Sequence, residues 1–399
     1  MKTSRIIHVT AYYPPHLGGQ EIVVQDLVAQ LTLAGEQAEV VTSSIGARRG
    51  VSVENGVLVT RLKSVELAHT AIIWRLFFWL LRHAGRDTIV HLHVGQFFTP
   101  EVVWLAAKVK RFRYIFHLHC DLVQSGPMGK FLPLHKRIFL GREVNDAELV
   151  IVLNNELRQA VRHDHGYGGK LIIMSNGIDE EFFKITRKPA VSKALKLLFV
   201  GRLSPHKNLA ALLEALSMIK REITLDIVGD GECHREVRML IADNKLGNVR
   251  LHGRLSRDEV RRFYATCHAL ILPSLYEAQP IALLEAMASR IPIIVTKGIG
   301  IEVTAQEAVL IEPTAQGIAD GIEIFATMVP EAQDLLADAA FKRAEKHRWP
   351  ALIGSYTDLY DGIAENIESP KRSLPEHLRW SGRNAGEAGQ RHGTDTDAS

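Results

Sequence analysis

Two basic residues, Arg202 and Lys207, follow the apolar run at residues 197–200, on a loop that we expect to open a helix. A guanidinium can bind a phosphate through two hydrogen bonds, and an ammonium adds a mobile positive charge. Because reactive groups of open α/β sheets collect beyond the carboxyl ends of the strands, both side chains could reach one site there. Together they would neutralise a departing diphosphate without a metal ion. The alternative at this point is a solvated loop with two exposed bases.

Two carboxylates, Glu277 and Glu285, flank the start of a second predicted helix. Proline suits the first position of a helix, so Pro280 would place Glu277 on the preceding loop and Glu285 in the second turn. Both carboxylates could accept hydrogen bonds from sugar hydroxyls, and the free backbone N–H groups near Ile281 and Ala282 could meet a phosphate. Without its context, Glu285 would more simply be an ordinary residue on a helix surface.

A glycine pair, Gly18 and Gly19, follows the first predicted strand and precedes a helix. Glycines there allow a close approach to the backbone and leave N–H groups free for phosphate oxygens. An ordinary turn explains the pair equally well, because the pattern is neither the dinucleotide fingerprint nor the Walker loop.

Histidines end two predicted strands, as the pairs His91/His93 and His117/His119. Alternation places both members of each pair on one face of the sheet. A metal site is one explanation, but a hydrolytic centre would usually add carboxylate ligands, and only Asp121 is near. We therefore predict packing or supporting hydrogen bonds for His91, His93 and His117, no metal site, and a position facing a cleft for His119.

These residues depend for their placement on two rounds of short apolar runs that alternate with helical patterns, such as the spacing of Val24, Leu27, Val28 and Leu31. Near-continuous apolar strands separated by helices indicate a parallel sheet covered on both faces. The predicted fold class is α/β, with two doubly wound domains. We expect strands at residues 6–9, 39–42, 57–59, 88–92, 114–118, 149–152 and 171–173, and then at 197–200, 225–228, 249–251, 269–272, 291–295 and 309–311.

The domain boundaries come from length and composition. A chain of 399 residues with 46% hydrophobic residues is long enough for two or three domains with buried cores. The polar segment 179–193, which contains Pro189, is the predicted linker between a first domain at 1–184 and a second at 194–345. A final helix is expected at 346–366, and the polar composition of 369–399 predicts a disordered tail.

Composition also excludes several classes of protein. No run approaches the roughly 20 apolar residues that span a bilayer, which argues against an integral membrane protein. The N-terminal residues lack the apolar region and cleavage site of a signal peptide, so we expect a cytoplasmic protein. The three cysteines, Cys120, Cys233 and Cys267, make neither a disulfide framework nor a thiolate zinc site.

The formal net charge of +3 is unevenly distributed. Between Arg61 and Arg142 there are thirteen Lys and Arg but four Asp and Glu. Such a stretch favours an anionic partner, whether membrane lipids, nucleic acid or an acidic substrate. A solvated basic face without a specific partner is the alternative.

Four groups of residues resemble the retaining glycosyltransferases of family 4, and they occur in the order of that family. They are Pro14-Pro15 with Gly18-Gly19 and Glu21, then residues 176–179, then residues 199–208 with Arg202 and Lys207, then residues 273–288 with Glu277 and Glu285. The resemblance runs from about residue 6 to Asp361. It includes the segment of Trp349 and Tyr360, which resembles the final helices that cross back onto the first domain in this family. It implies the GT-B fold, in which two Rossmann-like domains face a cleft.

The resemblance also implies roles for individual residues. Arg202 and Lys207 would bind the diphosphate of a nucleotide-sugar donor, Glu285 the ribose hydroxyls and Glu277 the transferred sugar. His119 would contact the donor sugar and help to hold it for attack. Gly18 and Gly19 would line the phosphate and acceptor side, and Ile281 and Ala282 would offer backbone N–H groups to the donor. The implied reaction retains anomeric configuration by front-face attack, with no metal and no cofactor.

This chain departs from the family pattern at three places. Ala278 and Gln279 follow Glu277 where relatives commonly have Gly and Phe, which leaves the identity of the transferred sugar open. Ser289-Arg290 replaces a small residue followed by Gly, and Ser175 replaces a Pro. We interpret the last two changes as structural.

In family members the first domain receives the acceptor, a saccharide or lipid-linked sugar. The segment 67–82 has aromatic residues and basic ends, as interfacial helices do, and 128–142 is a second such stretch. We expect peripheral docking of the first domain on the anionic inner face of the cell membrane, and no nucleic-acid partner; a buried helix at 72–81 is the alternative. The competing functions are a sugar-nucleotide epimerase of the same fold and a non-catalytic module that binds nucleotide-sugars.

Overall fold

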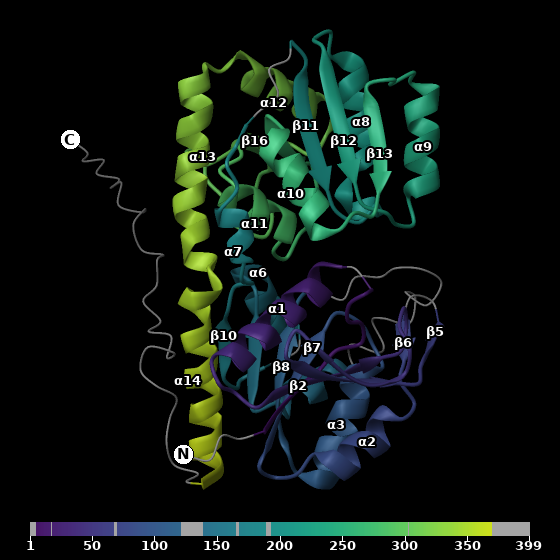
Figure 1. Cartoon of the computed structure of the whole chain (residues 1–399), viewed down its shortest axis with the longest axis vertical. Coiled ribbons are helices and arrows are strands. Elements are labelled where there is room, and N and C mark those ends of the chain that lie inside the picture. The colour runs from purple at the N-terminus through teal and green to yellow at the C-terminus, as the bar shows by residue number, and fades with distance from the viewer. Residues whose placement is uncertain are drawn as a thin grey trace, which may run out of the picture.

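A computed structural model of the chain describes residues 5–16, 18–67, 70–120, 139–164, 167–188, 193–301 and 303–368. It consists of two α/β domains stacked along the long axis, with one long C-terminal helix running beside the first domain (Figure 1). Each domain has its own largely parallel sheet, which confirms the predicted fold class.

The first sheet is parallel except at one edge. All of the predicted strands are present, and β3 was not predicted because its exposed Val51 and Val53 form only a short alternation at the sheet edge. Its order is β10 (Leu171–Ile173), β9 (Leu149–Val152), β8 (Arg113–Leu118), β7 (Thr88–Val94), β1 (Arg5–Val9), β2 (Ala38–Ser43), β4 (Val57–Leu62) and antiparallel β3 (Gly50–Glu54).

Helices cover both faces of this sheet because its strands alternate apolar side chains between the two sides. On one face, Ile6, Ile89 and Ile115 pack with α1 (Gly19–Leu33) and α14 (Trp349–Glu368). On the other, the core is shared with α2 (Leu76–His83), α3 (Thr99–Lys110), α5 (Gly141–Asn145) and α6 (Asn155–Asp164).

The second sheet is wholly parallel and is surrounded by a single hydrophobic core. Its order is β13 (Val249–Gly253), β12 (Ile223–Val228), β11 (Leu195–Val200), β14 (Ala269–Leu272), β15 (Ile293–Thr296) and β16 (Val309–Ile311). The surrounding helices are α8 (Leu209–Met218), α9 (His234–Asp243), α10 (Arg257–Thr266), α11 (Ile281–Ala288), α12 (Ala315–Thr327) and α13 (Pro330–Ala344), with a 3₁₀ turn, η3, at Pro205–Lys207.

The chain passes between the domains twice, and the two passages are hydrogen bonded to each other. The N–H of Ile178 donates to the carbonyl of His347 at 2.8 Å, beside the 3₁₀ turn η4 (Glu345–His347). The predicted linker begins with a short helix, α7 (Glu180–Phe183), whose Phe182 is fully buried in the second core. Pro189 and the predicted tail at 369–399 lie outside the described residues.

One prediction of secondary structure is wrong in its extent. Residues 67–82 are not one helix: an antiparallel pair of strands, β5 (Val65–Leu67) and β6 (Thr70–Ile72), precedes α2. The β-branched Thr70 and Ile72 favour a strand over a helix. Of the second predicted interfacial stretch, residues 128–138 lie outside the described part of the chain.

Candidate functional site

The N-termini of two helices from different domains face each other. A Cβ added to Gly19, at the start of α1, would lie 3.6 Å from Cγ1 of Ile281, the first residue of α11. The N–H groups of Leu283 and Leu284 donate to the carbonyl of Pro280 at 3.1 and 3.3 Å. Pro280 is therefore the N-cap of α11, and the prediction that it is the first helical residue is wrong by one position. The N–H groups of Ile281 and Ala282 have no acceptor among the described residues.

Gly18 is the N-cap of α1 and has an extended backbone. A side chain there would collide with the carboxylate of Glu21, whose Oε1 lies 3.0 Å from Nδ1 of His16. The ring of His16 in turn stacks on Tyr12, with ring centroids 4.2 Å apart. Gly18 thus leaves room for a carboxylate and a histidine on the rim of the first domain.

Lys207 and Glu277, predicted for one site on separate loops, form an ion pair between Nζ and Oε1. Their side chains are only 12% and 10% exposed, and the hydroxyl of Ser274 donates to the same carboxylate oxygen at 2.8 Å. Lys207 ends the turn η3, and Glu277 lies on the loop between β14 and α11. The pair therefore joins two loops at the carboxyl edge of the second sheet.

Arg202 lies nearer the surface. Its Nε contacts Oε2 of Glu232 at 3.0 Å, and its side chain is 56% exposed. Burial and Glu66 raise the pKa of Tyr12 in the first domain, and the charge of Arg202 opposes them. Arg202 thus presents an exposed guanidinium on the loop that follows β11.

Glu285 is buried, so the simpler interpretation of it as a helix-surface residue is wrong. It is 6% exposed, and its Oε2 accepts a hydrogen bond from the hydroxyl of Tyr264 at 3.1 Å. Burial raises the pKa of Glu285 to about 7, although Arg257 and Tyr264 oppose that shift. At neutral pH this group is therefore close to its ionisation midpoint, and in its ionised form it accepts hydrogen bonds only.

Arg257, which was not predicted, ties the two domains together beside Glu285. Its guanidinium contacts Oδ1 of Asp26 on α1 at 2.9 Å and Oδ2 of Asp179 at 3.5 Å. Arg257 and Asp26 are far apart in the sequence, so no local pattern could have indicated the contact.

A second unpredicted feature is the glycine turn behind the Arg202 loop. Gly229 has φ +138°, and a Cβ there would collide with the carbonyl oxygen of Gly201. Gly201 donates its N–H to the carbonyl of Val228 at 3.0 Å. The turn at Gly229 therefore sets the position of the loop that carries Arg202.

Gly229→Ala should displace this loop, weakening binding of a nucleotide diphosphate roughly tenfold or more and lowering the melting temperature. Backbone strain of this kind costs about 1–3 kcal/mol. Gly247→Ala is the matched control, because the space around Gly247 is open. Calorimetric titration and thermal melting measure both effects, and equal behaviour of the two variants would contradict the role given to Gly229.

His119 follows β8 and is 7% exposed. Its Nε2 lies 2.9 Å from Nδ1 of His93, and its ring stacks on His117 with centroids 4.1 Å apart. His91 also bonds His117, so the predicted supporting hydrogen bonds of these histidines are present. The described contacts join His119 to the first domain, and its placement against a donor sugar stays a prediction.

Two departures from the family pattern contact each other. The amide nitrogen of Gln279 donates to the hydroxyl of Ser175 at 2.8 Å, while its amide oxygen accepts from the N–H of Asn176 at 2.6 Å. Gln279 therefore links the loop of Glu277 to the passage between the domains.

The third departure, Arg290, has φ +53°, a conformation suited to the Gly of relatives. Its guanidinium lies 4.1 Å from the ring centroid of Phe341.

Comparison with known proteins supports this geometry. The model of the glycosyl transferases of group 1 matches residues 180–342, and that of the glycosyl transferase 4-like domain matches residues 18–177. The chain belongs to the glycosyl transferases of group 1. Its two parallel, Rossmann-like sheets give it the GT-B fold of this family.

Among curated relatives, the amylovoran biosynthesis glycosyltransferase AmsK of Erwinia amylovora is 30% identical, over 33% of this chain and 35% of its own length. The chain thus spans about a third of that relative. The GDP-mannose:cellobiosyl-diphosphopolyprenol alpha-mannosyltransferase of Komagataeibacter xylinus is 24% identical over 94% of this chain and 96% of its own. Among solved structures, HepE of Anabaena in complex with UDP-glucose has a similar fold, with TM-score 0.69, 19% identity and coverage of 92% of this chain and 99% of that one.

Proposed function

We propose that this glycosyltransferase moves a sugar, with retention of anomeric configuration, from a nucleotide-diphosphate donor to a saccharide or lipid-linked acceptor in cell-envelope polysaccharide or glycolipid synthesis. The observation that carries the proposal is the pair of Lys207 and Glu277 at the carboxyl edge of the second sheet. The pair sets a cation for the diphosphate beside a carboxylate for the sugar. Similar proteins support the class, since HepE was solved with UDP-glucose and the Komagataeibacter relative is a mannosyltransferase that acts on a cellobiosyl-diphosphopolyprenol.

In this proposal the second domain holds the donor. Lys207 and Arg202 neutralise the diphosphate together with the free N–H groups that begin α11, and the carboxylate of Glu285 accepts hydrogen bonds from the ribose. Charge placed where the leaving diphosphate develops lowers the barrier most in a site that excludes water. These cations make a metal ion unnecessary, so the rate should be the same in EDTA.

Glu277 and His119 act on the transferred sugar. Lys207 and Ser274 both contact Oε1 of Glu277, so its second oxygen, Oε2, can accept from a sugar hydroxyl. Gly18 and Gly19 leave the acceptor side open to the same point. Positioning of the two substrates then allows the acceptor to attack from the face that the diphosphate leaves.

A panel of nucleotide-sugars tests this function. The purified protein should transfer a sugar to a lipid-linked or saccharide acceptor, and it should slowly hydrolyse the preferred donor when the acceptor is absent. Binding of nucleotide diphosphates without hydrolysis or transfer across the panel would favour a non-catalytic module. Interconversion of donor epimers would favour the epimerase.

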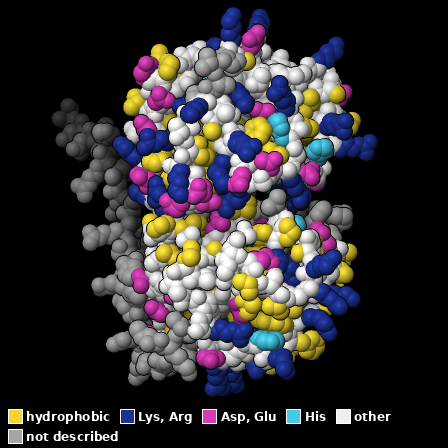
Figure 2. Space-filling view, viewed as in Figure 1, with side chains coloured by type: hydrophobic (Ala, Val, Ile, Leu, Met, Phe, Trp, Pro, Cys, Tyr) yellow, Lys and Arg dark blue, Asp and Glu magenta, His cyan; other side chains and the backbone are white. Residues whose placement is uncertain are grey.

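We also propose that the protein works in the cytoplasm on the inner face of the cell membrane. In the described part of the chain, no helix is long and apolar enough to cross a bilayer. The helices α2 and α3 adjoin each other, and together with the turn before α2 they expose apolar side chains. Among them are Trp74 (64%) in that turn, Phe78 (70%) on α2 and Val109 (61%) on α3. Figure 2 shows hydrophobic side chains gathered at this end of the first domain, with Lys and Arg among them. Apolar side chains ringed by bases suit an anionic lipid surface.

The Trp74→Ser/Phe78→Ser double variant should bind anionic liposomes at least tenfold more weakly than the wild type, because burying each apolar side chain contributes about 1.5–3 kcal/mol. Flotation at low and high salt measures the binding, and salt should weaken it. Leu335→Ser on α13, where Leu335 is 71% exposed, is the matched control. Absence of wild-type binding at low salt would overturn membrane docking without touching the enzymatic proposal.

A further inference from the structure

Five histidine side chains lie together beneath the carboxyl edge of the first sheet. His8 comes from β1, His91 and His93 from β7, His117 from β8 and His119 from the residue after β8. His119 is 7% exposed, and the other four are at most 1% exposed. The proposed function uses only His119, which leaves four buried histidines without a role.

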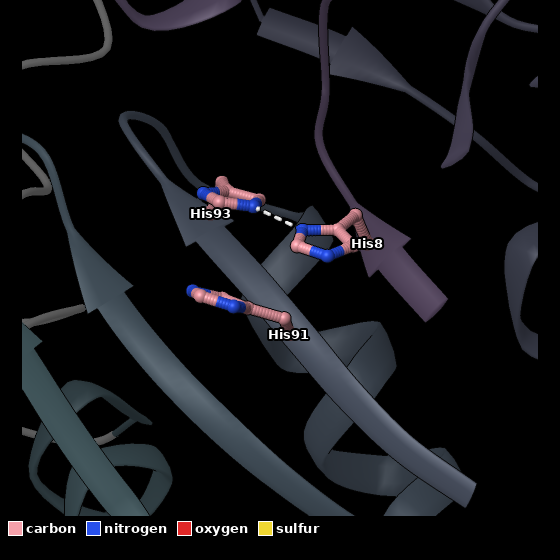
Figure 3. Close-up of side chains that lie close together, drawn as sticks. All are labelled: His8, His91 and His93. Atoms are coloured by element: carbon pink, nitrogen blue, oxygen red, sulfur yellow. Dashed lines mark hydrogen bonds between the residues drawn. The ribbon is translucent and has the colours of Figure 1, made fainter. Parts of the chain in front are cut away.

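Three of these rings are joined edge to edge. Nδ1 of His8 lies 3.0 Å from Nε2 of His93, and Nδ1 of His93 lies 2.9 Å from Nε2 of His119. The rings of His8 and His93 are 16° from coplanar with centroids 5.3 Å apart, as two imidazoles joined by an in-plane N–H···N bond should be. Figure 3 shows His8 and His93 bonded, with His91 beside them. The three rings, of His8, His93 and His119, form a histidine chain that runs from the core to the edge of the sheet.

A metal ion is the other explanation for such a cluster. The sets His8/His91/His93 and His93/His117/His119 each bring three ring nitrogens within 4.8 Å of one another. A bound ion must lie in the plane of every ligand ring, about 2.0–2.1 Å from each nitrogen. His91 stacks on His93 at 4.4 Å and 11°, and His117 stacks on His119 at 4.1 Å and 26°. Because stacked planes do not converge on one point, the geometry favours the hydrogen-bonded chain.

The chain fixes the tautomer of each ring in turn. Burial lowers the pKa of His8 and of His119 to about 3, and burial with the neighbouring histidines lowers that of His93. Each ring is therefore neutral and carries one N–H. If one ring donates outward, the next must accept on its inner nitrogen and donate from its outer one.

His8, at the buried end of the histidine chain, decides which ring donates in each hydrogen bond. Nε2 of His8 has no hydrogen-bond partner among the described residues. Buried N–H groups without an acceptor are rarer in proteins than buried acceptors without a donor, so the proton of His8 belongs on Nδ1. His8 then donates to His93, His93 donates to His119, and the proton of His119 lies on Nδ1.

We infer that His8 and His93 are positioning residues that hold His119 as an Nδ1–H donor at the edge of the first sheet, for an oxygen of the bound sugar. The identity of that ligand rests on the proposed function. Since Nε2 of His8 has no partner in the described structure, the chain offers no exit for a proton. The histidine chain therefore orients His119 and does not conduct protons.

Long-range ¹H–¹⁵N correlation spectra of the full chain with ¹⁵N-labelled histidine test the inference directly. We expect His8, His93 and His119 each to show a single Nδ1–H tautomer at pH 7.5. His8→Leu should turn His119 into a mixture of tautomers, whereas His8→Asn, which keeps an N–H in place of Nδ1, should restore the single form. Tyr360→Phe is the matched control, because the hydroxyl of Tyr360 bonds His91 at 2.6 Å and His91 is not part of the histidine chain.

Activity gives the second readout. His8→Leu should lower kcat/KM for the donor about tenfold, the size expected for one lost hydrogen bond, and His8→Asn should recover most of it. An Nε2–H tautomer at His119 in the wild type, an unchanged His119 in a folded His8→Leu variant, or stoichiometric zinc on the purified protein would overturn the inference. Expected tautomers in a protein that transfers no sugar would instead refute the proposed function and leave the chain intact.

Discussion

Lys207→Ala should lower kcat/KM for the nucleotide-sugar roughly a hundredfold. The lysine would supply a charge-assisted hydrogen bond to the diphosphate, worth about 1.5–3 kcal/mol. Its loss would also leave Glu277 as an unpaired carboxylate that is 10% exposed. Removing one partner of a nearly buried pair costs about 3–5 kcal/mol, so the variant should also melt at a lower temperature.

Two comparisons separate these effects. The double variant Lys207→Ala/Glu277→Ala should recover stability, because no buried charge is left alone, but it should not recover activity. Arg202→Ala should lose less than Lys207→Ala, since the Arg202 side chain is 56% exposed. Donor kinetics and thermal melting of the three variants measure the difference. Wild-type kinetics in Lys207→Ala would refute the donor site.

Glu285→Gln should raise the free energy of unfolding above pH 7 and lower the affinity for the donor. The folded-state pKa of Glu285 is raised from 4.5 to about 7, so the folded state holds this proton to a higher pH than the unfolded chain does. The free energy of unfolding of the wild type therefore falls as pH rises from 4.5 to 7, by up to about 3 kcal/mol from this group. The Glu285→Gln variant has no charge at this position and escapes that loss.

The same substitution should weaken binding of the intact donor about tenfold at pH 8, because an amide accepts ribose hydroxyls less strongly than a carboxylate does. Wild-type affinity should rise between pH 6 and pH 8 as Glu285 ionises, and the variant should show a flat profile. Urea unfolding and calorimetric titration at pH 5 and 8 check both parts. Equal stability of the two proteins at pH 8 would contradict the raised pKa.

Much of the fold follows from local pattern. Short apolar runs and the helical spacing of Val24, Leu27, Val28 and Leu31 predict each main strand and the buried face of α1. The strand β3 escapes because its apolar residues are exposed at an edge. The antiparallel strands β5 and β6 were not predicted, because the aromatic and basic residues that follow them resemble an interfacial helix.

For the candidate site, the sequence indicated charged residues but not the residues that contact them. Lys207 and Glu277 follow strands that lie side by side, β11 and β14, so their meeting follows from the order of the sheet. Tyr264 reaches Glu285 from another helix, and Arg257 reaches Asp26 in the other domain. These contacts depend on how helices and domains pack, which no spacing in the sequence encodes.

Histidine alternation indicated two pairs, but not the chain that they form. His8 joins His93 only because β1 lies next to β7 in the sheet, although long stretches of sequence separate the two strands. The departures at Ser175 and Gln279 carried a usable signal, since two unusual residues in one chain can compensate each other by contact. The structure shows that contact at 2.8 Å.

The last helix of the chain completes the first domain. The buried side chains of α14, which are Trp349, Tyr356 and Tyr360, pack on the face of the first sheet that carries Ile6 and Ile89. During synthesis the first domain emerges early together with α1, yet the part of this sheet face that α14 covers stays exposed until the ribosome has made the second domain and α14. Domains that fold during synthesis usually close in order from the N-terminus. Here the first domain to emerge is the last to be completed, because part of its core is formed only when α14 has been made.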